Sequence, residues 1–148
     1  MQKNHFLALI AIAIFTLSIA SCKKEVIVTP AVVLTPSQLL VSGSWKLSAE
    51  TEDGVDSYTK QSACEKDDFY TYTAAGKFTQ DRGATKCDAA DDQTITFDYT
   101  LTADGKIITF RLPGSDPFDA KVVELTATTL KTQITALGSV LVSTYSKK

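Results

Sequence analysis

Few side chains in this sequence could carry catalytic chemistry. Its cysteines are Cys22, Cys64 and Cys87, and its only histidine is His5. Nucleophilic catalysis by serine or cysteine usually needs a histidine base, and many metal sites use histidine as a ligand. His5 lies in a segment with the features of a cleaved export signal, so we expect no histidine in the mature chain. Since no spacing of lysine, tyrosine or carboxylate residues singles out another catalytic set, we expect a protein that is not an enzyme and needs no cofactor.

Two acidic groups each follow one of the later cysteines. The first consists of Glu65, Asp67 and Asp68, and the second of Asp88, Asp91 and Asp92. Clustered carboxylates are typical ligands of hard cations such as calcium, and a bond between Cys64 and Cys87 would bring the two groups close together. However, aspartate is also frequent in turns, neither group matches an EF-hand loop, and Lys66 and Lys86 could neutralise them. We therefore expect acidic surface loops and no metal.

Residues 1–21 have the pattern of a secretory signal. Lys3 precedes a mainly apolar run of 14 residues, 6–19. This run is shorter than the roughly 20 residues of a membrane-spanning helix and suits the apolar region of a signal peptide, although an uncleaved anchor is the alternative. Ile19-Ala20-Ser21-Cys22 resembles the lipobox of bacterial lipoproteins. The resemblance implies cleavage before Cys22, lipidation of that residue and membrane anchorage, and we expect a cell-envelope protein at the outer membrane.

The mature chain would have 127 residues, enough for one domain with a real core. Loss of Lys3 leaves 14 basic against 17 acidic residues, a net charge of −3. Because no cluster of lysine or arginine is present, nucleic-acid binding has no electrostatic support. Cys64 and Cys87 remain as an even pair, which in an exported protein most simply forms a disulfide. A metal pair or a catalytic thiol would need further ligands or a partner base.

Residues 22–34 are predicted to form a lipidated tether that leads to a domain at 35–148. Apolar tether residues such as Val32 and Val33 could instead pair with a sheet edge. The sequence Thr35-Pro36-Ser37-Gln38 predicts a capping box with proline at the first helical position. The resulting helix should be one or two turns long and end at Gly43.

Alternating apolar and polar residues then predict eight strands separated by short turns. They are expected at residues 44–51, 68–73, 77–81, 93–101, 106–112, 119–126, 130–136 and 140–146. Trp45, Leu47 and Ala49 should share one face of the first strand, and Val123 and Leu125 one face of the sixth. Because no long helical pattern intervenes, the sheet should be antiparallel. Eight such strands can close into an up-and-down barrel, with a two-sheet β-sandwich as the alternative.

Several motifs, in this order and spacing, resemble the lipocalin-like domain of bacterial surface lipoproteins. They are Gly43-Ser44-Trp45-Lys46-Leu47 after the short helix, Cys64-Glu65-Lys66-Asp67-Asp68, Ala75-Gly76-Lys77-Phe78, Gly83-Ala84-Thr85-Lys86-Cys87, Leu101-Thr102-Ala103-Asp104-Gly105-Lys106, Leu125-Thr126-Ala127-Thr128-Thr129-Leu130 and Tyr145. The resemblance covers about residues 39–147. It implies an eight-stranded barrel with a helix near one end, and it supports a Cys64–Cys87 bond. Better-known lipocalins stack an arginine from the last strand on the first-strand tryptophan, whereas this chain has only Lys147 and Lys148 there.

These features together predict a lipid-anchored binding module of the cell envelope, with a small apolar ligand entering the open end of the barrel. Trp45 is expected to close the base of the barrel as a core residue. The other aromatic candidates could either line a ligand cavity or fill the barrel, and they are Tyr70, Tyr72, Phe78, Phe97, Tyr99 and Phe110. If the barrel is filled, the alternative is a structural or protein-interaction lipoprotein, whose loops 52–66 and 83–92 contact another envelope protein.

Overall fold

The computed structural model describes residues 32–148, of which Val33–Lys148 form one compact unit. The predicted signal peptide at 1–21, the lipidation site Cys22 and the tether up to residue 31 lie outside the described residues. The tether residues Val32 and Val33 are described, and both are exposed and belong to no strand. No helix within residues 32–148 is long and apolar enough to cross a membrane.

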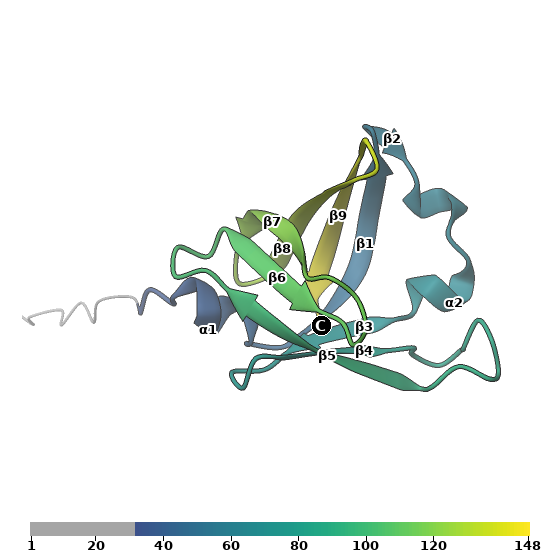
Figure 1. The fold of residues 1–148 in the computed structure, drawn as a ribbon, viewed down its shortest axis with the longest axis horizontal. Helices are drawn as coiled ribbons and strands as arrows, with labels where there is room; N and C mark the ends of the chain where they lie inside the picture. The colour runs from purple at the N-terminus through teal and green to yellow at the C-terminus, as the bar shows by residue number, and fades with distance from the viewer. Residues whose placement is uncertain (1–31) are drawn as a thin grey trace, which may run out of the picture. The chain divides into compact units, whose positions relative to one another are not determined.

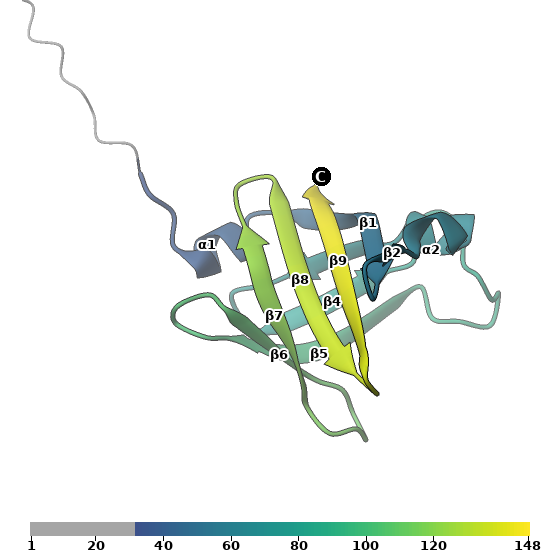
Figure 2. The same ribbon diagram turned by 90° about the horizontal axis from the view of Figure 1, so that it is seen from above.

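Eight antiparallel strands close into a barrel (Figures 1 and 2). The barrel strands are β1 (Ser44–Glu52), β3 (Phe69–Tyr72), β4 (Lys77–Asp81), β5 (Thr94–Leu101), β6 (Ile107–Arg111), β7 (Phe118–Leu125), β8 (Thr129–Ala136) and β9 (Ser139–Lys147). Each strand pairs with its neighbour in this order, and β9 pairs with β1 along nearly its whole length. This closure confirms the predicted barrel and excludes the sandwich, because a sandwich leaves its sheets unjoined.

The short helix α1 (Pro36–Leu40) begins as predicted, but it ends at the C-cap Val41 and not at Gly43. The Gln38 backbone N–H donates to Thr35 Oγ1, and the Gln38 side chain accepts from the Thr35 backbone N–H at 2.9 Å, which completes the capping box. Pro36 packs on Gly105 in the β5–β6 hairpin, where any side chain would collide with the proline ring. Gly105 also has a positive φ of 72°, so the hairpin and the helix contact both require glycine there.

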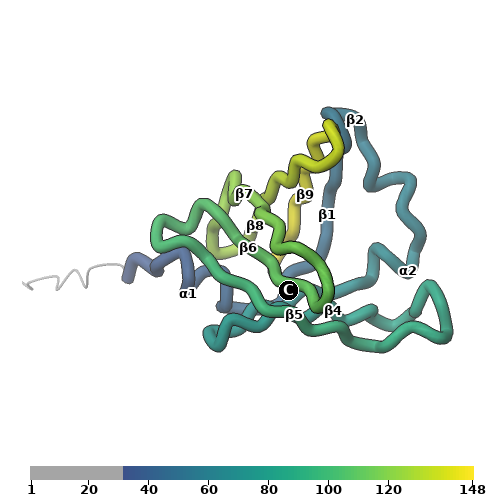
Figure 3. The backbone as a smooth tube through the Cα atoms, viewed as in Figure 1, coloured from purple at the N-terminus to yellow at the C-terminus, as the bar shows by residue number. Residues whose placement is uncertain are grey.

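The connection between β1 and β3 contains three short elements that the sequence analysis did not predict. They are β2 (Val55–Asp56), the 3₁₀ turn η1 (Tyr58–Lys60) and α2 (Ala63–Lys66), and Figure 3 traces their path. β2 pairs back on the end of β1 through a turn at Asp53 and Gly54, both of which have positive φ. β1 itself pairs with β3 at only two positions, so this connection runs beside a part of β1 that has no β3 partner.

The end of the barrel nearest α1 is filled by side chains. Leu40, Trp45, Ile108 and Leu130 are the largest side chains with no exposed surface. Trp45 Nε1 donates to the Leu40 carbonyl at 2.9 Å, which ties β1 to the end of the helix. This end is therefore closed without an arginine.

Lys147 lies over this closed end, in the region where better-known lipocalins have an arginine. Its Nζ donates to Ser42 Oγ at 2.8 Å. Its carbon stem lies so close to Gly43 that a Cβ there would approach it within 2.7 Å. The lysine stem thus covers the turn between α1 and β1.

Two β-bulges overturn the predicted faces of β1 and β7. The register of β1 on β9 shifts between Leu47 and Ala49, so Ala49 turns outward and Glu50 faces the interior. The register of β7 on β8 shifts in the same way between Val122 and Glu124, and Val123 is 49% exposed. Each bulge inserts one residue, and one extra residue reverses the alternation of side chains beyond it.

Candidate functional site

The barrel interior contains a cavity of about 220 Å³. Its lining comes from seven of the eight barrel strands, and the residues are Tyr70, Tyr72, Phe78, Gln80, Phe97, Phe110, Leu112, Phe118, Ala120, Thr132, Ile134 and Tyr145. Gln80, Leu112 and Phe118 lie near the strand ends that are remote from the Gly105 hairpin and α1. The cavity therefore occupies the half of the barrel opposite the filled end.

The structure divides the seven aromatic candidates between the two halves of the barrel. Five of them, Tyr70, Tyr72, Phe78, Phe97 and Phe110, line the cavity. The other two belong to the core. Trp45 fills the closed end, and Tyr99 is buried with its hydroxyl donating to the Thr73 carbonyl at 2.9 Å.

Four phenyl rings from neighbouring strands form one wall of the cavity. Phe97 stacks on Phe78 with ring centroids 6.0 Å apart, and Phe118 stacks on Phe110 at 5.2 Å. Phe78 and Phe110 join the two pairs in a T-shaped contact at 5.1 Å. Aromatic pairs in these geometries add to the stability gained by burial, so this wall is held in place before any ligand arrives.

The lining also carries hydroxyl and amide groups, which come from Tyr70, Tyr145, Thr132 and Gln80. Burial raises the pKa of Tyr70 and of Tyr145, which keeps both phenols neutral at physiological pH. The cavity thus combines an apolar wall with a few uncharged polar groups, which is the usual composition of a small-molecule site.

Glu50 lies on β1, where it pairs with Ser143 of β9. Its carboxylate accepts hydrogen bonds from Ser143 Oγ at 3.0 Å, Gln61 Nε2 at 2.7 Å and Ser57 Oγ at 3.2 Å. Ser143 faces the interior next to Tyr145, whereas Ser57 and Gln61 belong to the β1–β3 connection. Glu50 therefore joins the interior of the barrel to the segment that runs beside β1.

Seven of the lining residues, and Glu50, are not among the candidates predicted from the sequence. Gln80 and Thr132 alternate with the apolar residues Phe78 and Leu130, and this spacing could have identified them as inward-facing. Phe118 was missed because it precedes the predicted start of its strand by one residue. Glu50 could not be found from alternation, since the bulge in β1 reverses its side.

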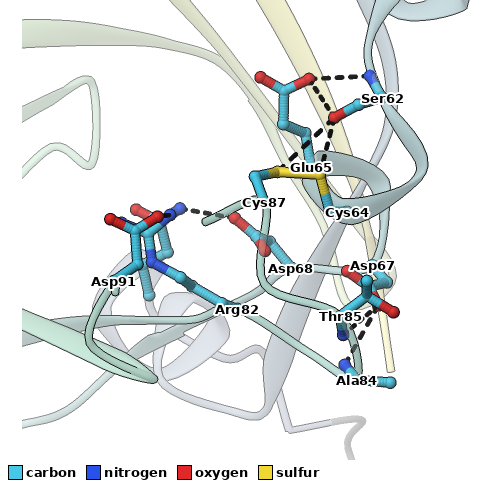
Figure 4. The surroundings of a disulfide bond; sticks show 11 residues. Ser62, Cys64, Glu65, Asp67, Asp68, Arg82, Ala84, Thr85, Cys87 and Asp91 are labelled. Atoms are coloured by element: carbon cyan, nitrogen blue, oxygen red, sulfur yellow. Dashed lines mark hydrogen bonds and ion pairs between the residues drawn. A yellow bond between two sulfur atoms is a disulfide. The ribbon is translucent and has the colours of Figure 1, made fainter. Parts of the chain in front are cut away.

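The disulfide joins α2 to the β4–β5 loop, with 5.2 Å between the Cα atoms of Cys64 and Cys87 (Figure 4). The two acidic groups that follow these cysteines make separate contacts. Asp67 accepts from the backbone N–H groups of Ala84 and Thr85, and Asp91 forms an ion pair with Arg82 at 3.1 Å. Within residues 32–148, no three His, Cys, Asp or Glu side chains gather in an arrangement that could hold a metal ion.

Asp68 does not lie in an exposed loop as expected, because only 5% of its surface is accessible. Its carboxylate accepts from Gln80 Nε2 at 2.6 Å. Asp68 directly precedes β3, and its neighbour Asp67 accepts hydrogen bonds from the β4–β5 loop at Ala84 and Thr85.

The buried carboxyl of Asp68 should make stability depend on pH. Burial raises the pKa of Asp68, against the smaller opposing effects of the Gln80 hydrogen bond and the Arg82 charge. Since its folded pKa exceeds the unfolded value of about 3.9, its contribution becomes more favourable as the pH falls through the folded pKa. Asp68→Asn should therefore be more stable than wild type at pH 7, and this advantage should shrink toward pH 4. Urea unfolding at both pH values measures it.

Glu65 offers a control, because its contribution to stability should change with pH in the opposite direction. The backbone N–H and the hydroxyl of Ser62 lower the pKa of Glu65, so its contribution is present at neutral pH and is lost as the pH falls through the lowered pKa. Glu65→Gln should therefore cost more stability at pH 7 than in acid. An advantage of Asp68→Asn that grows toward pH 4 would contradict the burial of its charge.

Larger hollows exist on the outside of the barrel, but they are more open to solvent. One of them, of about 510 Å³, runs between α1, the β5–β6 hairpin and β7. It includes the charged residues Asp104, Lys106, Lys121 and Glu124, and it lacks aromatic side chains. The interior cavity is smaller and more enclosed, and it gathers aromatic walls around convergent polar groups, so it is the better candidate for a binding site.

Comparison with known protein families identifies residues 41–132 as a lipocalin-like domain. No curated protein and no solved structure matches the chain at significant similarity. The matched segment covers more than half of the 148 residues and spans β1 to the middle of β8 of the closed barrel. The chain therefore belongs to the family of lipocalin-like domains.

Proposed function

We propose that this protein is a lipid-anchored binding module of the cell envelope, at the outer membrane, that takes a small apolar ligand into its barrel. The observation that carries the binding role is the 220 Å³ interior cavity with its wall of phenyl rings. Domains of this family are typically binding rather than catalytic, which agrees with this role. The lipobox-like sequence before Cys22 supports the anchor and the location.

The volume of the cavity limits the size of the ligand. Pockets for drug-sized molecules measure roughly 300–1,000 Å³, whereas an apolar cavity of about 150 Å³ is enough to bind benzene. A cavity of about 220 Å³ therefore suits one substituted ring or a short acyl chain. Burying such a ligand against Phe78, Phe97 and Phe110 supplies the driving force, at about 25 cal/mol per Å² of apolar surface.

Native mass spectrometry of the full chain, purified from its own membranes, tests both parts of the proposal. We expect a mass increase at Cys22 that corresponds to acyl groups, together with a retained small molecule. The unmodified mass of Cys22 would refute the anchor. Absence of a retained molecule, together with no binding of added ring compounds, would refute the ligand role and favour the protein-interaction alternative through loops 52–66 and 83–92.

Filling the cavity should abolish binding. Ala120 is buried and lines the cavity, so Ala120→Phe places a ring where the ligand would lie. We expect the affinity for benzyl alcohol, measured by calorimetry or ligand-observed NMR, to fall at least about tenfold, a loss of about 1.4 kcal/mol. The matched control is Val123→Phe, which adds a larger side chain to the same strand at an outward position and should leave binding unchanged. Equal binding by both variants would place the ligand outside the barrel.

A further inference from the structure

Among residues 32–148, no positively charged side chain lines the interior cavity. Its polar members are Gln80, Thr132 and the tyrosines 70, 72 and 145, and its other lining residues are apolar. A ligand with a carboxylate head would therefore meet hydroxyl and amide groups but no arginine or lysine. Burying a carboxylate without a cationic partner is costly, because the lost hydration is not replaced.

Two carboxylates lie close to the lining, and one of them is hydrogen-bonded to a lining residue. Asp68 accepts from the lining residue Gln80 at 2.6 Å, and Glu50 accepts from Ser143, the neighbour of Tyr145 on the inner face of β9. Glu50 accepts three hydrogen bonds, from Ser57, Gln61 and Ser143. Burial raises the pKa of Tyr70 most, and Tyr145, Asp68 and Glu50 add to this effect in that order.

The three cations Arg82, Lys46 and Lys148 contact groups outside the cavity lining. Arg82 pairs with Asp91 at 3.1 Å and donates to the Asp92 carbonyl, in the β4–β5 loop. Lys46 and Lys148 both lie over the ring of Phe69, with nitrogen-to-centroid distances of 5.4 and 5.2 Å. Phe69 neighbours Tyr70 in the strand and so faces the opposite side of the sheet. Arg82 lowers the pKa of Asp68, but this effect is smaller than that of burial, which raises it.

We propose that this cavity selects its ligand by head-group charge: it accepts an apolar body with a neutral or cationic head, such as an alcohol or an amine, and rejects a carboxylate. This inference rests on the proposed ligand-binding function and specifies the ligand class. It predicts that fatty acids and aromatic acids are excluded, even when their apolar parts fit.

A series of three ligands with one ring and different charges tests this selectivity. Benzyl alcohol, benzylamine and benzoate share a phenyl ring that fits the cavity, and at pH 7 they are neutral, cationic and anionic. Titration of the full chain at low salt should show benzoate binding at least about tenfold more weakly than benzyl alcohol, with benzylamine as tight as the alcohol or tighter. Benzoate binding within twofold of the alcohol overturns the charge selection but leaves the binding function intact. Failure of all three to bind overturns both.

Glu50→Gln links the selectivity to a named residue. The glutamine oxygen can still accept from Ser57 and Gln61, and its amide can donate to Ser143, so the geometry is retained while the charge is lost. We expect the ratio of the dissociation constants of benzoate and benzyl alcohol to fall at least about threefold. Asp98→Asn is the matched control, because it removes one carboxylate from the exposed outer face, where Asp98 pairs with Lys77, and should leave this ratio unchanged.

Asp68→Asn repeats the test at the second carboxylate, in case Glu50→Gln does not fold. The asparagine oxygen can still accept from Gln80, so the geometry is retained while the charge is lost. The ratio of the dissociation constants of benzoate and benzyl alcohol should therefore fall in this variant as well. The proposal is overturned if the ratio of the dissociation constants of benzoate and benzyl alcohol is unchanged in both interior variants. It is also overturned if this ratio falls equally in Asp98→Asn, because the selectivity would then not depend on these two charges.

Discussion

Replacing Trp45 by alanine is expected to lower the free energy of unfolding by about 3–5 kcal/mol, the usual cost of truncating a buried aromatic side chain. Trp45 has no exposed surface and packs in the closed end of the barrel with Leu40, Ile108 and Leu130. Its indole N–H also holds the Leu40 carbonyl at 2.9 Å. The truncation would leave a cavity and an unpaired carbonyl together. Since domains are stable by only about 5–15 kcal/mol, this single change threatens the fold.

Chemical unfolding of the full chain measures this loss, and Trp45→Phe separates its two causes. Phenylalanine keeps most of the apolar volume but cannot donate to Leu40, so it should lose only part of the stability, about 1–3 kcal/mol. The position of Trp45 in the filled half also predicts that Trp45→Phe retains ligand affinity. Loss of less than 1 kcal/mol in Trp45→Ala would show that Trp45 is not part of a packed core.

Removing the disulfide by the double change Cys64→Ala/Cys87→Ala should cost about 3.4 kcal/mol on the chain-entropy model. The bond joins residues 23 apart in sequence, and without it the unfolded chain recovers the freedom of that closed loop. The bond also holds α2 against the β4–β5 loop, at the end of the barrel where the cavity lies. We therefore expect weaker ligand binding as well as lower stability.

The measurement is urea unfolding of the wild type and the double variant, each with and without a reducing agent. Reduction should destabilise the wild type to about the level of the double variant, and it should leave the double variant unchanged. A reductant effect on the double variant would implicate another group, and a wild type insensitive to complete reduction would contradict the stabilising role of the bond. The single variants should resemble the double variant, because either one breaks the bond.

Most of the barrel could be predicted from the sequence because its signals are local. Each predicted strand boundary lies within one residue of the observed one, since alternation of apolar and polar residues needs only that one face be buried. The capping box at Thr35 and Gln38 is local in the same way, because its hydrogen bonds join residues three apart. The elements between residues 53 and 67 were missed because they are too short to show a period.

The position of Glu50 shows where local signals end. Strict alternation places Glu50 outside with Lys46 and Ser48, whereas the bulge in β1 turns it inward toward Ser143 on β9. The bulge forms between strands that lie about 90 residues apart in the sequence, and no local pattern announces it. Asp68 is similar: its sequence context is that of an acidic loop, whereas the structure buries it directly before β3.

The sequence by itself determined the strands, their turns and the helix start, because each follows from residues close in the chain. It also determined the cysteine pair, because an even number of cysteines remains once Cys22 is set aside. The tertiary structure decided that β9 closes on β1, that one half of the barrel is filled around Trp45, and that the other half keeps a cavity with two carboxylates close to its lining. Closure and cavity volume depend on how side chains from all eight strands meet across the interior, and those distances exist only once the barrel has formed.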